Sequence, residues 1–319
     1  MRLLFLGSPE EAVPFLEECA RGHEVAAVVT RPDKPSGRRL LLSAPPVKRA
    51  AERLGLRVLQ PEDPRQALAE LRSLGADLAV VVAYGRILEG EILAAAKLGF
   101  LNAHFSLLPR WRGAAPIAWA LMSGDARTGV THFWLDEGMD TGPVQRMAAL
   151  DIREDDDALS LTRRLVELGV SELREALREV AQGRIRREPQ SGEAARAPKI
   201  GPELAELAFS LEPAQFHGRV RALQGGTKPY LKLKVGGRQA PLRVAVLKTA
   251  AEGALAPPEE PEAAGRVLRV ERARGILIAL RGGRLWLSQV QIEGKKPISA
   301  ADFLNVLRMS PGGRLETTP

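Results

Sequence analysis

Short apolar runs alternate with helical segments through the first part of the chain, and this order restricts the fold more than any other feature. Runs rich in apolar and β-branched residues stand at MRLLFLG, HEVAAVV, ADLAVVVAYG and FLNAHFS. Between the first two, Val13, Leu16 and Ala20 recur at helical spacing, and GEILAAAKLG, residues 90–99, is also predicted to be helical. Strands that alternate with helices predict a doubly wound, mostly parallel sheet of the α/β class, whose ligands bind beyond the carboxyl ends of the strands.

The residue composition and the apolar pattern of the chain change after residue 188. The stretch PQSGEAARAPKIGP is polar and contains Pro, Gly and Ser, which predicts a linker over residues 189–202. Beyond it, PLRVAVLKTA, GRVLRVER, GILIALRGG and RLWLSQVQIEG alternate in the manner of short strands joined by glycine turns. We therefore expect a first domain over residues 1–188 and a smaller β-barrel domain over residues 203–319.

Positive charge is concentrated in the C-terminal part of the chain. The formal net charge is +7, and residues 1–188 hold 26 Lys and Arg against 27 Asp and Glu. Residues 189–319 hold 20 against 12, a net charge of +8. A basic domain of this kind favours a polyanionic partner such as nucleic acid, although the charge also aids solubility.

Polar side chains follow one another at every second position of the predicted strand FLNAHFS. Asn102, His104 and Ser106 therefore share one face of this strand. Asn102 supplies a neutral N–H donor, and histidine exchanges its proton near neutral pH. Asp140, in the glycine-flanked loop LDEGMDTGP, is the best candidate for a partner carboxylate. This set contains no obvious nucleophile, so it suits acyl transfer in which the substrate attacks and the protein stabilises an oxyanion and moves protons.

Several classes of protein are disfavoured. Cys19 is the only cysteine, and no Cys/His cluster has metal-ligand spacing, so neither an internal disulfide nor a metal site is expected. No apolar run is long enough to cross a membrane, and a cytoplasmic location is expected. The Gly-x-Gly-x-x-Gly turn of dinucleotide-binding folds and the Walker A motif are both missing, and one Asp-Thr-Gly is insufficient for an aspartic protease.

Two segments, NAHFSLLPRWRGAAPI and GDARTGVTHFWLDEGMDTGPV, resemble the signature of the folate-dependent formyltransferases. The resemblance extends to GSPEEAVPFL, RPDKPSGRRLLLSAPPVK, VVVAYGRIL, APKI and EGKKPISAADFL, and so to nearly the whole chain. It implies a Rossmann-like formyl-transfer domain, a linker and an OB-like barrel. It also implies 10-formyltetrahydrofolate as the formyl donor, initiator methionyl-tRNA as the acceptor, no metal, and a protein that acts as a monomer.

The same resemblance implies roles for individual residues. The catalytic residues would be Asn102, His104 and Asp140. Folate contacts would come from two segments: Ser106, Leu107, Leu108 and Pro109 in the first, and Tyr84, Gly85 and Ile87 in the second. The tRNA-recognition loop falls on residues 31–46, with Arg38 as the key arginine and Arg39 beside it. The length of this loop and its prolines and glycine predict an irregular, functional segment.

Three other functions are compatible with parts of this pattern. A formyltransferase could act on a small amine, such as glycinamide ribonucleotide or an amino sugar. A related enzyme could hydrolyse 10-formyltetrahydrofolate by transferring the formyl group to water. A tRNA-binding module could retain the fold with a decayed active site, which the intact Asn102, His104 and Asp140 argue against. The basic C-terminal part and the arginine-bearing loop favour tRNA over a small acceptor.

Overall fold

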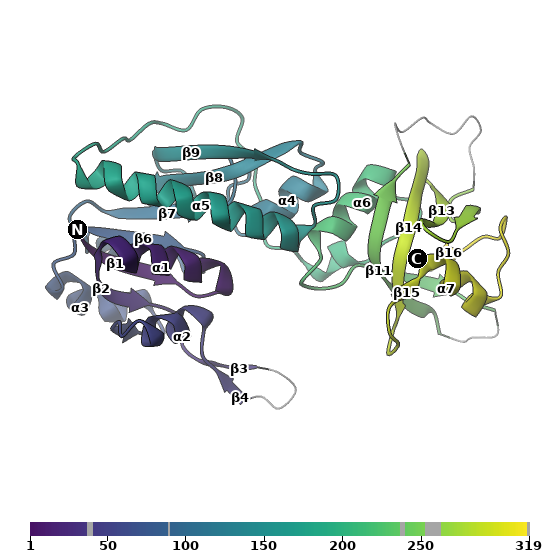
Figure 1. The fold of residues 1–319 in the computed structure, drawn as a ribbon, viewed down its shortest axis with the longest axis horizontal. Coiled ribbons are helices and arrows are strands. Elements are labelled where there is room, and N and C mark those ends of the chain that lie inside the picture. Colours follow the sequence, from purple (N-terminus) through teal and green to yellow (C-terminus); the bar gives the residue numbers. More distant parts are fainter. Residues whose placement is uncertain (37–40, 89, 237–239, 253–262, 318–319) are drawn as a thin grey trace. The chain divides into compact units, whose positions relative to one another are not determined.

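The computed structural model describes residues 1–36, 41–88, 90–236, 240–252 and 263–317 (Figure 1). The chain divides into two compact units. The N-terminal unit consists of Met1–Pro116, Arg127–Asp151 and Thr162–Pro198. The C-terminal unit consists of Ile117–Ala126, Ile152–Leu161 and Lys199–Pro319, so two short segments from the first half of the chain belong to it.

A mixed sheet forms the centre of the N-terminal unit. Among the described residues it has seven strands in the order β5-β2-β1-β6-β7-β8-β9. In chain order these are β1 (Arg2–Gly7), β2 (Glu24–Val29), β5 (Val58–Leu59), β6 (Leu78–Val82), β7 (Phe100–His104), β8 (Arg127–Trp134) and β9 (Val144–Asp151). Pairing is parallel from β5 to β7 and antiparallel from β7 to β9. The predicted doubly wound, mostly parallel α/β sheet is therefore confirmed.

Helices cover both faces of this sheet, which explains why its central strands are apolar throughout. The helices of this unit are α1 (Val13–Gly22), α2 (Pro46–Arg53), α3 (Leu68–Ser73) and most of α5 (Ala158–Ala181), whereas α4 (Pro116–Met122) falls almost wholly in the C-terminal unit. Helices α1 and α5 lie on the same face (Figure 1), where Gly169 approaches Phe15 so closely that a Cβ atom would lie 2.7 Å from its ring. On the other face, Leu4 and Leu6 pack with Leu71 of α3.

The helix predicted over residues 90–99 is wrong. Only a single 3₁₀ turn forms, at η3 (Gly90–Ile92), and irregular turns lead from it to β7. Gly90 and Gly99 adopt positive φ angles of 54° and 96°, which bend the chain at both ends of the segment. Apolar residues between the two glycines, including Ala95 and Ala96, still pack into the core. The apolar pattern of this segment therefore indicates burial and not a helix.

The prediction of an irregular loop over residues 31–46 is wrong in part. Two short strands, β3 (Lys34–Ser36) and β4 (Leu41–Ser43), pair in antiparallel fashion, with Pro35 opposite Leu42. Proline is tolerated here because a two-stranded ribbon consists only of edge strands. Residues 37–40, which include Arg38 and Arg39, lie outside the described residues.

An antiparallel sheet with two helices forms most of the C-terminal unit. Among the described residues its strand order is β12-β13-β14-β11-β10-β16, and β15 pairs with β14. The elements are α6 (Pro213–Ala222), β10 (Tyr230–Lys234), β11 (Leu242–Ala251), β12 (Val267–Glu271), β13 (Gly275–Leu280), β14 (Gly283–Ile292), β15 (Ile298–Ser299), α7 (Ala300–Leu307) and β16 (Glu316–Thr317). This agrees with the predicted small β domain, although β10 and both helices were not anticipated.

Backbone contacts join the two ends of this sheet. An antiparallel bridge links Arg266, just before β12, to Arg314, just before β16, and Leu315 donates a hydrogen bond to Gly265 O at 2.8 Å. The sheet therefore curls toward closure as an OB-like barrel, and its interior is filled by Val244, Ile278 and Phe216 among others. Within the described part of the chain, no helix has the length and apolar character needed to cross a membrane.

Candidate active site

The carboxyl end of β7 carries Asn102 and His104, two of the three polar side chains singled out in the sequence. The strand ends at His104, so Ser106 lies in the loop beyond it and not on the strand where it was predicted. Strand β7 pairs with β6 in parallel and with β8 in antiparallel orientation, so the sheet changes its pairing here. Asn102 lies between Val81 and Phe133 of these neighbours, and His104 lies opposite Thr131. Asn102 is half-buried and His104 is 6% exposed. Their alternate positions place both on one face of the strand, as predicted.

Both ring nitrogens of His104 face defined oxygen atoms. Nε2 lies 2.8 Å from the carbonyl oxygen of Trp111, and Nδ1 lies 3.8 Å from Oδ2 of Asp140. A carbonyl oxygen can only accept a hydrogen bond, so Nε2 carries the hydrogen and donates it. The ring also meets Phe133 edge-on, at 6.3 Å between ring centroids, which limits its rotation. The nitrogen that faces Asp140 is therefore Nδ1.

Asp140 is held in an unusual backbone conformation beside this ring. Its φ angle is +55°, which costs about 1–3 kcal/mol for a residue other than glycine and persists only where neighbouring contacts fix it. Its Oδ2 atom accepts a hydrogen bond from the backbone N–H of Gly113 at 2.7 Å. The side chain is 17% exposed, so the carboxylate lies at the border between protein and solvent.

Gly113 can serve as this donor only because it is glycine. Its φ angle is +124°, and a Cβ atom there would lie 2.6 Å from the carbonyl oxygen of Ala197. Trp111, two residues earlier, also has a positive φ angle, 69°, and supplies the carbonyl that His104 bonds. Sequence reasoning missed both backbone groups, because a tryptophan and a glycine in a loop give no sign of which atoms they present.

The loop that follows β7 is fixed by its own polar groups. The hydroxyl of Ser106 donates to Arg110 O at 2.7 Å, and Thr131 Oγ1 donates to Ser106 O at 2.6 Å while accepting from Leu108 N at 3.1 Å. The peptide bond between Leu108 and Pro109 is cis. Ser106, Leu108 and Pro109 are buried, whereas Leu107 is half-buried. These four predicted folate residues therefore form a rigid loop next to His104.

The second predicted folate segment follows β6. Strand order reverses between β1 and β6, and Tyr84 and Gly85 come directly after β6 at this edge. Tyr84 is 2% exposed, its hydroxyl has no hydrogen-bond partner among the described residues, and burial raises its pKa. Gly85, with a φ angle of +73°, lies against the guanidinium of Arg31. Ile87 is 71% exposed, an unusual state for a large apolar side chain.

Other reactive side chains in the N-terminal unit are buried away from this site. Cys19 is fully buried, and burial raises the pKa of its thiol strongly, which disfavours a nucleophilic role. His132 is also fully buried, and burial together with the charge of Arg146 lowers its pKa to about 3. It therefore stays neutral in the folded protein. No group of three or more His, Cys, Asp or Glu side chains that could hold a metal occurs among the described residues.

The segment predicted as a linker is joined to the active-site loop by hydrogen bonds. Arg112 N donates to Ala195 O at 2.8 Å, and Ala197 N donates to Arg112 O at 2.7 Å. Ala195 N donates to Pro109 O at 3.2 Å and Ala115 N to Ala197 O at 3.1 Å. The chain over residues 195–197 thus runs alongside residues 109–115 like a short parallel strand, and it supports the backbone that contacts His104.

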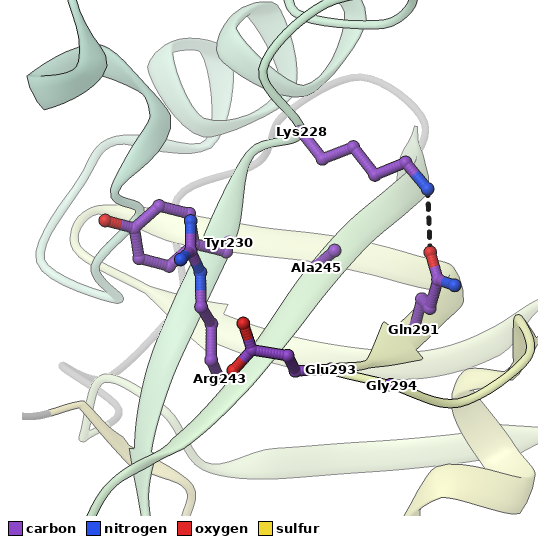
Figure 2. A pocket seen from close by; sticks show the side chains of 7 residues that line it. All are labelled: Lys228, Tyr230, Arg243, Ala245, Gln291, Glu293 and Gly294. Atoms are coloured by element: carbon purple, nitrogen blue, oxygen red, sulfur yellow. Dashed lines mark hydrogen bonds between the residues drawn. The ribbon is translucent and has the colours of Figure 1, made fainter. Parts of the chain in front are cut away.

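A pocket of about 320 Å³ lies on the outer side of the C-terminal sheet (Figure 2). The residues that line it are Lys228, Tyr230, Arg243, Ala245, Gln291, Glu293 and Gly294. The guanidinium of Arg243 stacks on the ring of Tyr230, 3.8 Å from its centroid. Lys228 Nζ donates to Gln291 Oε1 at 2.7 Å on the opposite side of the pocket. Two cationic groups therefore flank an opening whose floor is Ala245, as Figure 2 shows.

Comparison with known proteins identifies the family. Residues 1–177 match the formyl transferase family, and residues 199–308 match the formyl transferase C-terminal domain. The chain belongs to the formyl transferase family, as its motifs predicted.

Individual relatives agree with this assignment. Methionyl-tRNA formyltransferase of Elusimicrobium minutum is 37% identical over 330 residues, which cover 98% of each chain. The protein of the same name from Methylobacterium sp. is 42% identical over 320 residues, which cover 99% of each chain. Among solved structures, the N-formyltransferase from Helicobacter canadensis matches with a TM-score of 0.63 at 17% identity, covering 89% of this chain and 98% of that one, so it shares the fold.

Proposed function

We propose that the protein transfers the formyl group of 10-formyltetrahydrofolate to the α-amine of initiator methionyl-tRNA, with Asn102, His104 and Asp140 as its catalytic residues. The observation that carries this proposal is the position of His104, between the carbonyl of Trp111 and the carboxylate of Asp140 at the carboxyl edge of the sheet. Full-length similarity to relatives named methionyl-tRNA formyltransferase supports the choice of acceptor.

In the proposed reaction the substrate amine is the nucleophile. Free α-amines have pKa values near about 7.7–8.0, so a useful fraction of the esterified methionine is uncharged at neutral pH. The amine attacks the formyl carbon, a C–N bond forms, and the carbonyl oxygen becomes an oxyanion. Asn102 and protonated His104 stabilise this oxyanion, an effect worth about 3–4 kcal/mol for one such donor in other acyl transfers. The bond from the formyl carbon to N10 then breaks.

Protons move on the side of His104 that faces Asp140. Because Nε2 is committed to Trp111 O, Nδ1 is the nitrogen that gains and loses a proton. Its distance of 3.8 Å from Asp140 exceeds a hydrogen bond, and such contacts often tighten only when substrate binds. Asp140 orients His104 and collects the proton that the attacking amine loses. Nδ1 of protonated His104 gives its proton to N10 of the departing tetrahydrofolate, and the proton held by Asp140 then restores Nδ1.

We propose that folate binds along the edge formed by the ends of β6 and β7. Tyr84, Gly85 and Ile87 come from the first strand, and Ser106, Leu107, Leu108 and Pro109 from the loop after the second. The reversal of strand order next to β6 supports this location, since ligands of doubly wound sheets bind at such a point. The exposed Ile87 provides an apolar surface for the ring system, whereas Tyr84 is buried at the same edge of the sheet.

We propose two contact regions for tRNA. One is the loop of residues 31–46 with Arg38 and Arg39. The other is the pocket of Figure 2 in the C-terminal unit, where Arg243 and Lys228 would meet the phosphate backbone. The net charge of +8 over residues 189–319 supports this second region, because each neutralised phosphate releases a counterion.

We propose the domain limits 1–188 and 203–319, joined by a linker over residues 189–202. The first family match, residues 1–177, lies within the first domain, and most of the second, residues 199–308, lies within the last.

Asn102, His104 and Asp140 all belong to one unit of one chain, which supports a monomer as the active species. Light scattering at micromolar concentration tests this. We propose a cytoplasmic location on the basis of the proposed tRNA substrate, and fractionation of cells would test it.

One assay separates the candidate functions. The protein is incubated with 10-formyltetrahydrofolate and, in separate reactions, with initiator methionyl-tRNA, elongator methionyl-tRNA, glycinamide ribonucleotide, a nucleotide-linked amino sugar, or buffer alone. We expect formyl-methionyl-tRNA only in the first reaction. A formylated small amine would establish the alternative acceptor, and formate released in buffer alone would establish a hydrolase. Binding of tRNA with no product in any reaction would indicate a binding module.

A further inference from the structure

The side chain of Gln190 uses its full hydrogen-bonding capacity to connect two loops. Its Nε2 group donates to Asp140 O at 2.8 Å and to Gly142 O at 2.9 Å. Its Oε1 atom accepts from Nε of Arg112 at 3.1 Å and from Nη2 of the same residue at 2.6 Å. A primary amide has two N–H donors and two acceptor lone pairs, so none is left over. An amide used in this way is fixed in position and in orientation.

The two loops that Gln190 connects are those that contact His104. The loop at Arg112 supplies Trp111 O, which Nε2 of His104 bonds. The loop at Asp140 supplies the carboxylate that Nδ1 faces. Gln190 therefore lies behind both contacts of the imidazole without touching it.

The backbone around Gln190 is itself paired on both sides. Glu188 and Val144, at the start of β9, exchange two hydrogen bonds of 3.0 and 2.7 Å. Farther along, Ala195 and Ala197 bond the active-site loop at Arg112. The segment thus crosses from β9 to the loop after β7, and the Gln190 amide occupies the middle of this crossing. Removal of the side chain would leave both backbone pairings in place, so its effect can be separated from unfolding.

We propose that Gln190 is a positioning residue for catalysis, which holds Asp140 and the Trp111 carbonyl at a fixed separation on either side of His104. This inference rests on the proposed roles of His104 and Asp140. Asp140 has a positive φ angle and would relax toward a more ordinary conformation if its carbonyl lost the Gln190 contact. Its carboxylate would then move relative to Nδ1. A shift of about 1 Å at a catalytic group lowers turnover by about 100-fold.

The test compares three substitutions of Gln190 with a control. Gln190→Ala removes all four hydrogen bonds. Gln190→Glu keeps the acceptor for Arg112 but places carboxylate oxygens against Asp140 O and Gly142 O, and Gln190→Asn is one methylene too short to reach both loops. Gln182→Ala is the matched control, because that glutamine is exposed just after α5. Each variant is examined for kcat, KM for both substrates, the pH–rate profile and the melting temperature.

We expect a kcat about 10- to 100-fold lower for Gln190→Ala, with KM for both substrates within about twofold. Gln190→Glu should not restore activity, and the pH–rate profiles of both variants should differ in shape from that of the parent. The control should match the parent. An unchanged kcat would overturn the inference. So would a loss of activity that follows the melting temperature while the pH–rate profile keeps its parental shape, since that result describes a purely structural residue.

Parallel assays of His104→Gln and Asp140→Asn show whether a negative result concerns the role of Gln190 alone or the proposed catalytic roles on which it rests. If both variants lose activity and Gln190→Ala retains it, only the positioning role is wrong. If either His104→Gln or Asp140→Asn formylates methionyl-tRNA at the parental rate, the catalytic assignment itself fails, and the role of Gln190 fails with it.

Discussion

His104 and Asp140, 36 positions apart in the chain, face each other with 3.8 Å between Nδ1 and Oδ2. Each side chain of the pair also makes one hydrogen bond to a backbone group: His104 donates to a carbonyl, and Asp140 accepts from an N–H. The histidine proton acceptor is thereby assigned to Nδ1, and the carboxylate keeps one oxygen for other partners. The predictions below follow from this pair and its surroundings.

Asp140→Asn is expected to lower kcat by about 100- to 10,000-fold, because an amide cannot take up the proton of the attacking amine. The substitution preserves size and can still accept from Gly113 N, so folding and tRNA affinity should change little. Steady-state formylation and tRNA binding are measured side by side. Asp151→Asn, at an exposed position on β9, is the control. Equal turnover in the Asp140 variant and the control would refute the proton-transfer role.

Gly113→Ala is expected to reduce kcat by at least about 10-fold, because it displaces the N–H that holds the Asp140 carboxylate. Its Cβ atom would lie 2.6 Å from Ala197 O, in addition to the strain of the positive φ angle. Gly192→Ala is a matched control, since that glycine has a φ angle of +107° but open space around it. The control should lose about 1–3 kcal/mol of stability at most and keep its activity. Two variants with the same activity would show that the close approach to Ala197 is unimportant.

Arg243→Gln should weaken tRNA binding and reduce the slope of log affinity against log salt concentration by about one, the effect of losing one phosphate contact. Formylation of tRNA at saturating concentration should be affected less than binding. Arg281→Gln removes an exposed arginine that does not line the pocket of Figure 2, and it serves as the control. Affinity is measured by fluorescence anisotropy over a several-fold range of salt. A parental slope in Arg243→Gln would place the phosphate contacts elsewhere.

Arg38→Ala should weaken discrimination between initiator and elongator methionyl-tRNA more than it affects folate binding or stability. A guanidinium can make paired hydrogen bonds to nucleic acid, so we expect Arg38 to recognise a feature that differs between the two tRNAs. Formylation of both tRNAs is compared in the variant and the parent. If the variant formylates the initiator substrate at the parental rate and still rejects the elongator, Arg38 is not the reader and Arg39 becomes the next candidate.

Acid should destabilise the N-terminal unit through His132, whose pKa is lowered to about 3 by burial and by Arg146. The unfolded chain takes up this proton near pH 6.5, so between pH 6.5 and about 3 the unfolded state binds more protons. The free energy of unfolding then falls as the pH falls, by up to about 1.4 kcal/mol per pH unit from this site. His132→Gln removes the effect. Urea unfolding at several pH values should show the free energy of unfolding falling more steeply toward low pH in the parent than in the variant, and parallel curves would exclude His132.

The amino-acid sequence by itself determined the class of fold and singled out the side chains of the candidate active site. Alternating strand and helix patterns predicted a mostly parallel sheet, because a helix between two strands returns the chain to run in the same direction. The spacing of Asn102 and His104 fixed their common face, since a strand repeats every two residues. Charge counts located the basic part of the chain, because they do not depend on folding.

Tertiary structure decided which backbone atoms meet these side chains. No local pattern could indicate that Trp111 O contacts His104 and that Gly113 N contacts Asp140, because any peptide unit can donate or accept and only its position selects it. The same holds for Gln190, in a stretch whose polar composition predicts a linker but does not reveal its partners at Asp140 and Arg112. The composition of a segment indicates whether it can be exposed to solvent. Hydrogen bonds between distant segments form only after the sheet has brought their loops to the same edge.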